Sequence, residues 1–299
     1  NYQGHPYPET AHRTSPTNIG MMMLSTASAW DFGYLGREEL AARTTNLYVS
    51  LEKLETHRGH FLNWYDTLSL QPLEPRYVSV VDSGNLAGCL IAYTSLLKEL
   101  VQRPAIEPQR WRGLEDVMRL LAKAAGGASE DQGGLQSEVT LMNQNLVQIA
   151  ADPAKWHGGM KFVLENRIPV FQAKIATVAE QLDVISTEDL RELHTWLDRF
   201  RHQLVTMIHD IESLAPWLVI EDVPPEFQEL YAHVTELLSN PADDHYFSDA
   251  WLAIDRAKAD CQKQDPWLQS LADTVQVGEQ NRAKLAKTIS RLARKTEKY

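Results

Sequence analysis

Apolar residues recur at intervals of three and four along most of the chain, which is the spacing of one buried face of a helix. The pattern is longest and most regular after residue 103, where polar residues fill the positions between the apolar ones. It predicts helices over residues 107–125, 135–151, 154–185, 187–214, 225–239, 246–263 and 267–297. The sequence therefore predicts an all-α protein whose second part is a bundle of long helices.

Two neighbouring segments of this bundle carry an unbroken apolar seam. One seam runs over residues 164–185 and the other over residues 190–214, on either side of a turn at Ser186. Ser186 is followed by acidic residues, which is typical of a helix start. The spacing predicts an antiparallel, coiled-coil-like hairpin. Pro169 should kink or start its first helix.

The first 103 residues have a different pattern, in which apolar helices alternate with glycine, proline and aromatic residues. Ser15 and Asp82 stand where helix N-caps are expected, and Arg58-Gly59 is expected to end a helix. The change of pattern predicts two domains, residues 1–103 and 104–299. In the first domain, buried helices are predicted over residues 16–31, 37–57 and 83–102, with extended segments or a small hairpin over 61–65 and 77–81.

The net charge of −11 argues against a nucleic-acid-binding protein. The basic residues near the C-terminus are interpreted as a solvated last helix rather than a patch for membrane or polyanion. No stretch reaches the roughly 20 apolar residues that span a bilayer. The nearest, residues 19–30 and 86–97, are predicted to be buried helices, so no membrane span is expected in this chain.

Several classes of site are not indicated by the sequence. Cys89 and Cys261 are too few and too far apart for a disulfide framework or a zinc site, and they favour a reducing compartment. His194, His202 and His209 share one helix face but are two turns apart, too far for one metal. Phosphate loops, dinucleotide-binding glycine motifs and serine nucleophile elbows are not found. Neither a cofactor nor a metal is therefore predicted.

Polar and aromatic residues gather in three clusters of the first domain, each at one end of an apolar helix. The clusters are Arg13–Gly20, Arg58–Thr67 and Tyr77–Gly88. Asp, Asn and Arg side chains suit the hydroxyls of a sugar, and Trp or Tyr rings suit its apolar face. We predict one polar cleft whose substrate-binding residues are Arg13, Asn18, Arg58, Asn63, Trp64, Tyr65, Asp66, Asp82 and Asn85.

Each candidate also has a purely structural interpretation. Asp82 can simply cap a helix, Asn63 and Asp66 can close a turn, and Trp64 and Tyr65 can be core aromatics. Taken singly, these interpretations are preferred. Three clusters of one character within the first 103 residues favour a site.

The three segments resemble the cyclic β-1,2-glucan synthase family, in the region between its glycosyltransferase and phosphorylase-like parts. The resemblance continues through Asp31-Phe32-Gly33 and the helix after it, whereas residues 104–299 resemble the family only in being helical. It implies an (α/α)6 barrel related to endo-β-1,2-glucanases and a transglycosylase that closes linear β-1,2-glucan into a ring. It also implies a large protein of the bacterial inner membrane whose catalytic parts lie on the cytoplasmic face.

The chain departs from what this resemblance implies in one respect. Such a barrel needs two layers of helices, and only its first part is expected here. Retaining glycosyl transfer needs a carboxylate nucleophile and a carboxylic acid about 5 Å apart, and segments that would carry this pair are not found. Asp66 and Asp82 are therefore assigned to substrate hydroxyls or to orienting the pair, and no catalytic residue is named.

Three hypotheses follow for the function. In the first, the chain forms one wall of a cleft in an enzyme, with β-1,2-glucan and the remaining domains of its polypeptide as partners. In the second, the helices of residues 104–299 form a non-catalytic scaffold for the same large protein. In the third, the chain is part of an endo-β-1,2-glucanase-like hydrolase, which sequence alone does not separate from the first.

Overall fold

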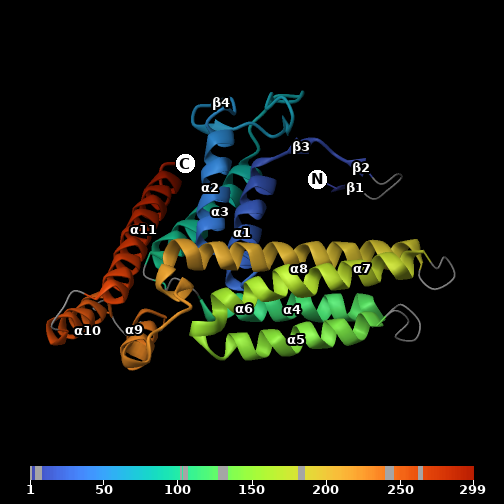
Figure 1. The fold of residues 1–299 in the computed structure, drawn as a ribbon. Coiled ribbons are helices and arrows are strands. Elements are labelled where there is room, and N and C mark those ends of the chain that lie inside the picture. The colour runs from blue at the N-terminus through green and yellow to red at the C-terminus, as the bar shows by residue number, and fades with distance from the viewer. Residues whose placement is uncertain are drawn as a thin grey trace. The chain divides into compact units, whose positions relative to one another are not determined.

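The computed structural model describes residues 2–3, 9–101, 103, 107–126, 134–180, 186–239, 246–261 and 265–299. These residues are mostly helical, with a few two-residue strands, so the predicted all-α class is confirmed (Figure 1). The chain divides into two compact units. The first unit comprises Asn1–Asp31, Arg37–Arg103 and Lys284–Tyr299, and the second comprises Phe32–Gly36 and Pro104–Ala283.

The first unit is built on three helices, α1 (Pro16–Asp31), α2 (Arg37–Leu51) and α3 (Val80–Leu100). α1 and α3 lie side by side over most of their length. The end of α11 (Pro266–Thr296) from Lys284 onward belongs to the same unit. The long apolar surfaces of α1 and α3 therefore cover each other.

Short strands connect these helices. β3 (Arg13–Thr14) pairs antiparallel with β6 (Tyr65–Asp66), so that Arg13 lies opposite Asp66. β4 (Thr56–His57) pairs with β5 (His60–Phe61), and β1 (Tyr2–Gln3) pairs with β2 (Glu9–Thr10). The β3–β6 pair brings together two segments that are about fifty residues apart in sequence, at the N-terminal end of α1.

The core of the first unit is apolar, with a few satisfied polar groups. Leu40, Tyr93 and Leu97 are buried, and the Tyr93 hydroxyl lies 2.6 Å from that of Thr44 on α2. Arg37 is also buried, and its Nη1 donates to the carbonyls of Leu100 and Arg103 at 3.2 and 2.7 Å. A cation at this place satisfies carbonyls that the end of α3 leaves without helical partners.

Two helix boundaries differ from the sequence prediction. α2 ends at Leu51 and does not continue to residue 57, because residues 56–61 form the β4–β5 hairpin. Arg58 and Gly59, at its turn, both have positive φ angles of 52° and 84°, as a two-residue hairpin requires. α3 begins at Val80, where Ser79 caps it by accepting the N–H of Asp82. The prediction that Asp82 is the N-cap was therefore wrong.

α3 also corrects the expectation about apolar length. By length and composition it is the one helix among the described residues that is apolar enough to cross a membrane, and a third of the apolar window is buried inside the protein. The helix is longer than the predicted apolar stretch of residues 86–97 because it begins earlier, at Val80. Core helices of soluble proteins meet the same criterion, and α3 buries Leu86, Leu90 and Leu97.

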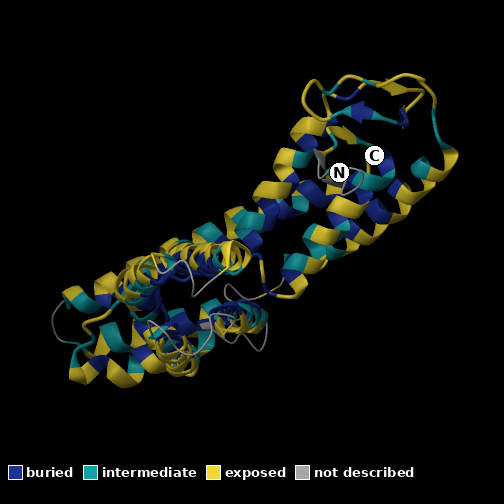
Figure 2. Cartoon of the chain, turned by 90° about the vertical axis from the view of Figure 1, so that its right-hand side faces the viewer, coloured by how far each residue is buried: buried dark blue, intermediate teal, exposed yellow. Residues whose placement is uncertain are grey.

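The second unit is a bundle of helices (Figure 1). Figure 2 shows that each helix turns its buried residues to one side. Three 3₁₀ turns, Pro153–Lys155, Pro216–Val219 and Pro225–Phe227, connect parts of it. Its helices are α4 (Pro108–Gly126), α5 (Leu135–Ala150), α6 (Trp156–Phe162), α7 (Ile168–Ala179), α8 (Thr187–Leu214), α9 (Gln228–Ser239), α10 (Tyr246–Asp260) and α11 up to Ala283.

The predicted apolar seams are buried, and α7 and α8 lie side by side in opposite directions, as in the predicted antiparallel hairpin (Figure 1). Phe171 on α7 and Phe200 on α8 are both fully buried. α8 contacts α6, residues 163–167 and α7, and it packs most extensively on α4. A π-helical segment, Val163–Arg167, precedes α7, as expected from Pro169, which has no N–H for a regular helical bond. Residues 181–185 of the predicted seam lie outside the described part of the chain.

A buried ion pair ties the loop of residues 32–36 to α4 and α8. The side chains of Arg110 and Asp210 are only 3% and 7% exposed, with 3.7 Å between Nη2 and Oδ2. Arg110 also donates to the Gly33 carbonyl at 3.2 Å and to the Thr206 hydroxyl at 2.9 Å. Gly36 is needed here, because a Cβ at this position would lie 2.2 Å from Asp210 Oδ2.

Candidate functional site

Asp82 links the first turns of α1 and α3. The hydroxyls of Ser79, Thr17 and Ser15 and the N–H of Thr17 lie close enough to its carboxylate to stabilise its charge. Ser15 in turn accepts the N–H of Asn18 at 3.3 Å. Asp82 therefore lies beside the first turn of α1 while belonging to the first turn of α3, where an anion is stabilised by the helix dipole.

Asn63 connects this carboxylate to the aromatic segment. In the amide orientation that satisfies all its partners, Nδ2 donates to Asp82 Oδ2 at 3.2 Å. Oδ1 then accepts from the Tyr77 hydroxyl at 2.7 Å and from Trp64 Nε1 at 2.6 Å. Asn63 is buried. It therefore holds Trp64, Tyr77 and Asp82 in a fixed relation.

The outer edge of the cluster is accessible to ligands. Arg13 is exposed, and its guanidinium carbon lies 5.3 Å from the centroid of the half-buried Trp64 ring. Tyr77 is 48% exposed. Asn85 is exposed and donates to Thr17 Oγ1 at 3.1 Å. We call the set Arg13, Thr17, Asn63, Trp64, Tyr77, Asp82 and Asn85 the polar cluster.

Asp66 lies next to this cluster through the strand pair with Arg13. Its Oδ1 accepts from the N–H groups of Leu68 and Ser69 at 2.9 and 2.7 Å, and from the Ser69 hydroxyl at 2.9 Å. These bonds close the turn after β6. Asp66 therefore closes a turn, as its structural interpretation proposed. It lies at the border of the polar cluster.

Besides Asp66, three candidates are not part of the polar cluster. Tyr65 is fully buried, and its hydroxyl donates to the Glu55 carbonyl and accepts from the Leu62 N–H, both at 2.6 Å. Its predicted role in stacking on a sugar is therefore corrected to that of a core aromatic. Arg58 lies at the tip of the β4–β5 turn. Asn18 lies in the first turn of α1, where its N–H completes the Ser15 cap.

Sequence reasoning did not name Thr17, Ser79 and Tyr77 as site residues, although each lies inside one of the three segments. Thr17 and Ser79 look like ordinary helix-start residues. Tyr77 looks like an extended aromatic position. Their roles depend on Asp82 and Asn63, which reach them from other segments, so no local signal distinguishes them.

The two carboxylates of this region are both held in the ionised form. The Ser79 hydroxyl bond, followed by those from Thr17, lowers the pKa of Asp82. The Ser69 N–H and hydroxyl lower the pKa of Asp66. A carboxylate with a lowered pKa accepts hydroxyl protons well but is a poor general acid. The cluster is thus suited to holding a hydroxylated ligand. Among the described residues no group of three or more His, Cys, Asp or Glu could hold a metal.

Replacing Asp82 by alanine should destabilise the first unit by about 1–2 kcal/mol, because the first turns of α1 and α3 lose an anion and Asn63 loses an acceptor. The Asp82 pKa is lowered on folding. The stability that its ionised carboxylate contributes is therefore fully present above the pKa of the unfolded chain, and it is lost as the pH falls through the pKa of the folded protein. The difference between wild type and Asp82→Ala in hydrogen exchange of α1 should therefore shrink below pH 4, near the ordinary Asp value. Equal differences at pH 7 and pH 3 would contradict this role.

Comparison with known proteins places these features in a wider context. The chain is 33% identical over 214 residues to the cyclic beta-(1,2)-glucan synthase NdvB of Rhizobium meliloti. This similarity covers 69% of the chain and only 7% of the synthase. A scan against models of protein families finds no match.

Proposed function

This chain is related to a cyclic β-(1,2)-glucan synthase over 214 residues, and from that premise we propose that its first unit binds β-1,2-glucan through the polar cluster. The observation that carries the proposal is the continuous path of neighbouring polar groups from Asn85 through Thr17, Asp82 and Asn63 to Trp64. It combines an aromatic ring with amide, hydroxyl and carboxylate groups, the combination that recognises a sugar.

We further propose that this region takes part in transglycosylation and ring closure of linear β-1,2-glucan, as one wall of a cleft in an (α/α)6-type barrel. The ionised Asp82 and the amides of Asn63 and Asn85 would orient hydroxyls of the glucan. Bond cleavage needs a protonated acid, which neither Asp66 nor Asp82 suits, because their pKa values are lowered. The chain would therefore bind and position the substrate, at the cytoplasmic face of the bacterial inner membrane.

A scaffold role is the second proposal, and the second unit supports it. α8 is 28 residues long and buries its apolar seam against α4 and its neighbours, which makes a stiff support for other domains of a long polypeptide. An endo-β-1,2-glucanase-like hydrolase would use the same cluster. That alternative differs in whether water or a glucan hydroxyl accepts the cleaved chain.

The test is a titration of the chain with linear glucans of one length and three linkages, β-1,2, β-1,3 and β-1,4. Only in β-1,2-glucan is each ring joined to the next through its 2-oxygen. A cluster built for this linkage should bind that glucan at least about tenfold more tightly than the other two, a difference of 1.4 kcal/mol. Equal affinity for all three linkages, or binding to none of them, would refute the proposal.

A further inference from the structure

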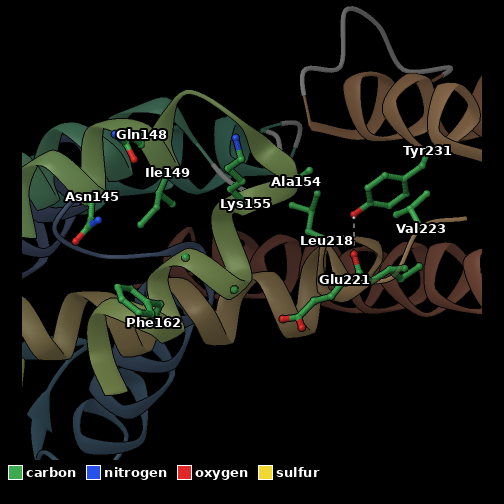
Figure 3. A pocket seen from close by; sticks show the side chains of 13 residues that line it. Asn145, Gln148, Ile149, Ala154, Lys155, Phe162, Leu218, Glu221, Val223 and Tyr231 are labelled. Atoms are coloured by element: carbon green, nitrogen blue, oxygen red, sulfur yellow. Dashed lines mark hydrogen bonds between the residues drawn. The ribbon is translucent and has the colours of Figure 1, made fainter. Parts of the chain in front are cut away.

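The second unit contains a cavity of about 390 Å³, which is far in sequence from the polar cluster (Figure 3). Its walls come from the C-terminal half of α5, from α6 and the 3₁₀ turn before it, and from residues 218–223, with Tyr231 of α9. A volume of this size lies in the usual range for small-ligand pockets. All its lining residues belong to the second unit.

Much of the lining is apolar. Ile149 and Leu218 are buried, whereas Phe162 is 45% exposed. The guanidinium carbon of Arg167 lies 5.7 Å from the centroid of the Phe162 ring. The Tyr231 hydroxyl is occupied, since it donates to the carbonyls of Trp217 and Ile220 at 3.1 and 3.4 Å. The cavity therefore offers one accessible aromatic ring, that of Phe162, and an aliphatic wall formed by Ile149 and Leu218.

The polar lining carries no net charge, because Lys155 and Glu221 oppose each other in sign. Lys155 Nζ is also paired with Asp152 Oδ2 at 3.0 Å. Asn145 and Gln148 add two neutral amides. Asn145 Oδ1 is buried without a hydrogen-bond partner among the described residues, so its amide must turn toward the cavity before a ligand can donate to it.

This combination selects a class of ligand. Because Lys155 and Glu221 are opposite in sign, the lining favours neither an anion nor a cation. A wholly apolar ligand would desolvate both charges without giving Asn145 a partner. A neutral ring compound suits this lining, because its edge hydroxyls keep the polar groups solvated and its C–H face can lie on Phe162. We propose that the cavity binds a neutral pyranose. Its identification as a glucose unit of β-1,2-glucan, held at a second site away from the polar cluster, rests on the proposed function.

The probe for this proposal is the β-1,2-linked glucose disaccharide, titrated by calorimetry, with glucose 6-phosphate and glucosamine as charged probes. Phe162→Ala should weaken binding at this site at least tenfold, and Val147→Ala should leave it unchanged. Val147 is 64% exposed on the same helix as Asn145 but does not line the cavity. The charged sugars should bind more weakly than the neutral one. Glu221→Lys should invert that order for the phosphate.

Experiments with Trp64→Ala separate the two sites. If this variant keeps part of the disaccharide binding and Phe162→Ala removes that part, both proposals are supported. If Trp64→Ala removes all binding, the cavity proposal is overturned and the polar cluster stands. If Phe162→Ala alone removes all binding, the polar cluster fails and the cavity stands. Tighter binding of glucose 6-phosphate to wild type, or no binding of any neutral sugar, overturns the cavity proposal.

Discussion

Replacing Asp210 by alanine is expected to lower the free energy of unfolding of the second unit by about 3–5 kcal/mol, because it leaves a buried guanidinium without its counter-ion. The Arg110 side chain is only 3% exposed and cannot regain water without opening the packing of α4 on α8. The same change frees the loop at Gly36, against which the carboxylate packs. Urea unfolding followed by circular dichroism measures the loss.

Asp198→Ala is the matched control, because Asp198 lies on the same helix with its side chain exposed. It should change the free energy of unfolding by no more than about 0.5 kcal/mol. Combining Arg110→Met with Asp210→Ala should cost less than the sum of the two single changes, since no charge is then left buried. A small effect of Asp210→Ala alone would show that Arg110 is adequately held by Gly33 and Thr206.

Trp64→Ala is expected to lower the affinity for β-1,2-glucan about 30- to 100-fold, the loss typical of a central aromatic contact of 2 kcal/mol or more. The substitution removes the ring proposed to meet a glucose face. It also releases Arg13, which lies over that ring, and leaves Asn63 without the donor at Nε1. Calorimetric titration with a linear β-1,2-glucan measures the change.

Trp251→Ala is the matched control for this experiment. Trp251 is also half-buried, and its Nε1 donates to Glu279 at 3.0 Å, but it belongs to α10 in the second unit. Its replacement should leave glucan affinity unchanged. Trp64→Phe should give an intermediate loss, because the ring remains and the bond to Asn63 does not. Equal affinity of Trp64→Ala and wild type, with the fold intact by circular dichroism, would contradict a role in binding.

The helices were predictable where their signals are local. The bounds of α1 and α8 follow from the caps Ser15 and Ser186 together with apolar spacing, and both helices occur where the sequence predicts them. α2 was predicted too long, because apolar spacing continues past Leu51. There, the two positive φ angles at Arg58 and Gly59 favour a hairpin over another helical turn.

The candidate site was predictable in outline only. The shared character of three segments led us to expect that their polar residues come together. The structure joins these residues by hydrogen bonds and a cation–π contact; they are Arg13, Asn63, Trp64, Asp82 and Asn85. Their role in binding a sugar stays a prediction. The sequence allowed a core position for both Trp64 and Tyr65. Which of the two is fully buried was not predictable, because it depends on the strand pairing of Tyr65 with Thr14.

Long-range polar contacts were outside the reach of sequence reasoning. Asp82 looks like the cap of its own helix, but Ser79 caps that helix, and Asp82 lies beside the first turn of α1, some 65 residues earlier. Arg110 and Asp210 are one hundred positions apart and lie on helices whose apolar seams say nothing about charge. Such contacts depend on the packing of whole helices, which local patterns do not encode.

The most direct measurement is hydrogen exchange of the chain with and without a saturating linear β-1,2-glucan. If the polar cluster grips glucose, exchange should slow together in residues 13–20, 61–67 and 77–88, and Asp82→Ala should weaken that protection. Unchanged exchange in all three segments, under conditions where calorimetry shows the glucan to be bound, would contradict the assignment.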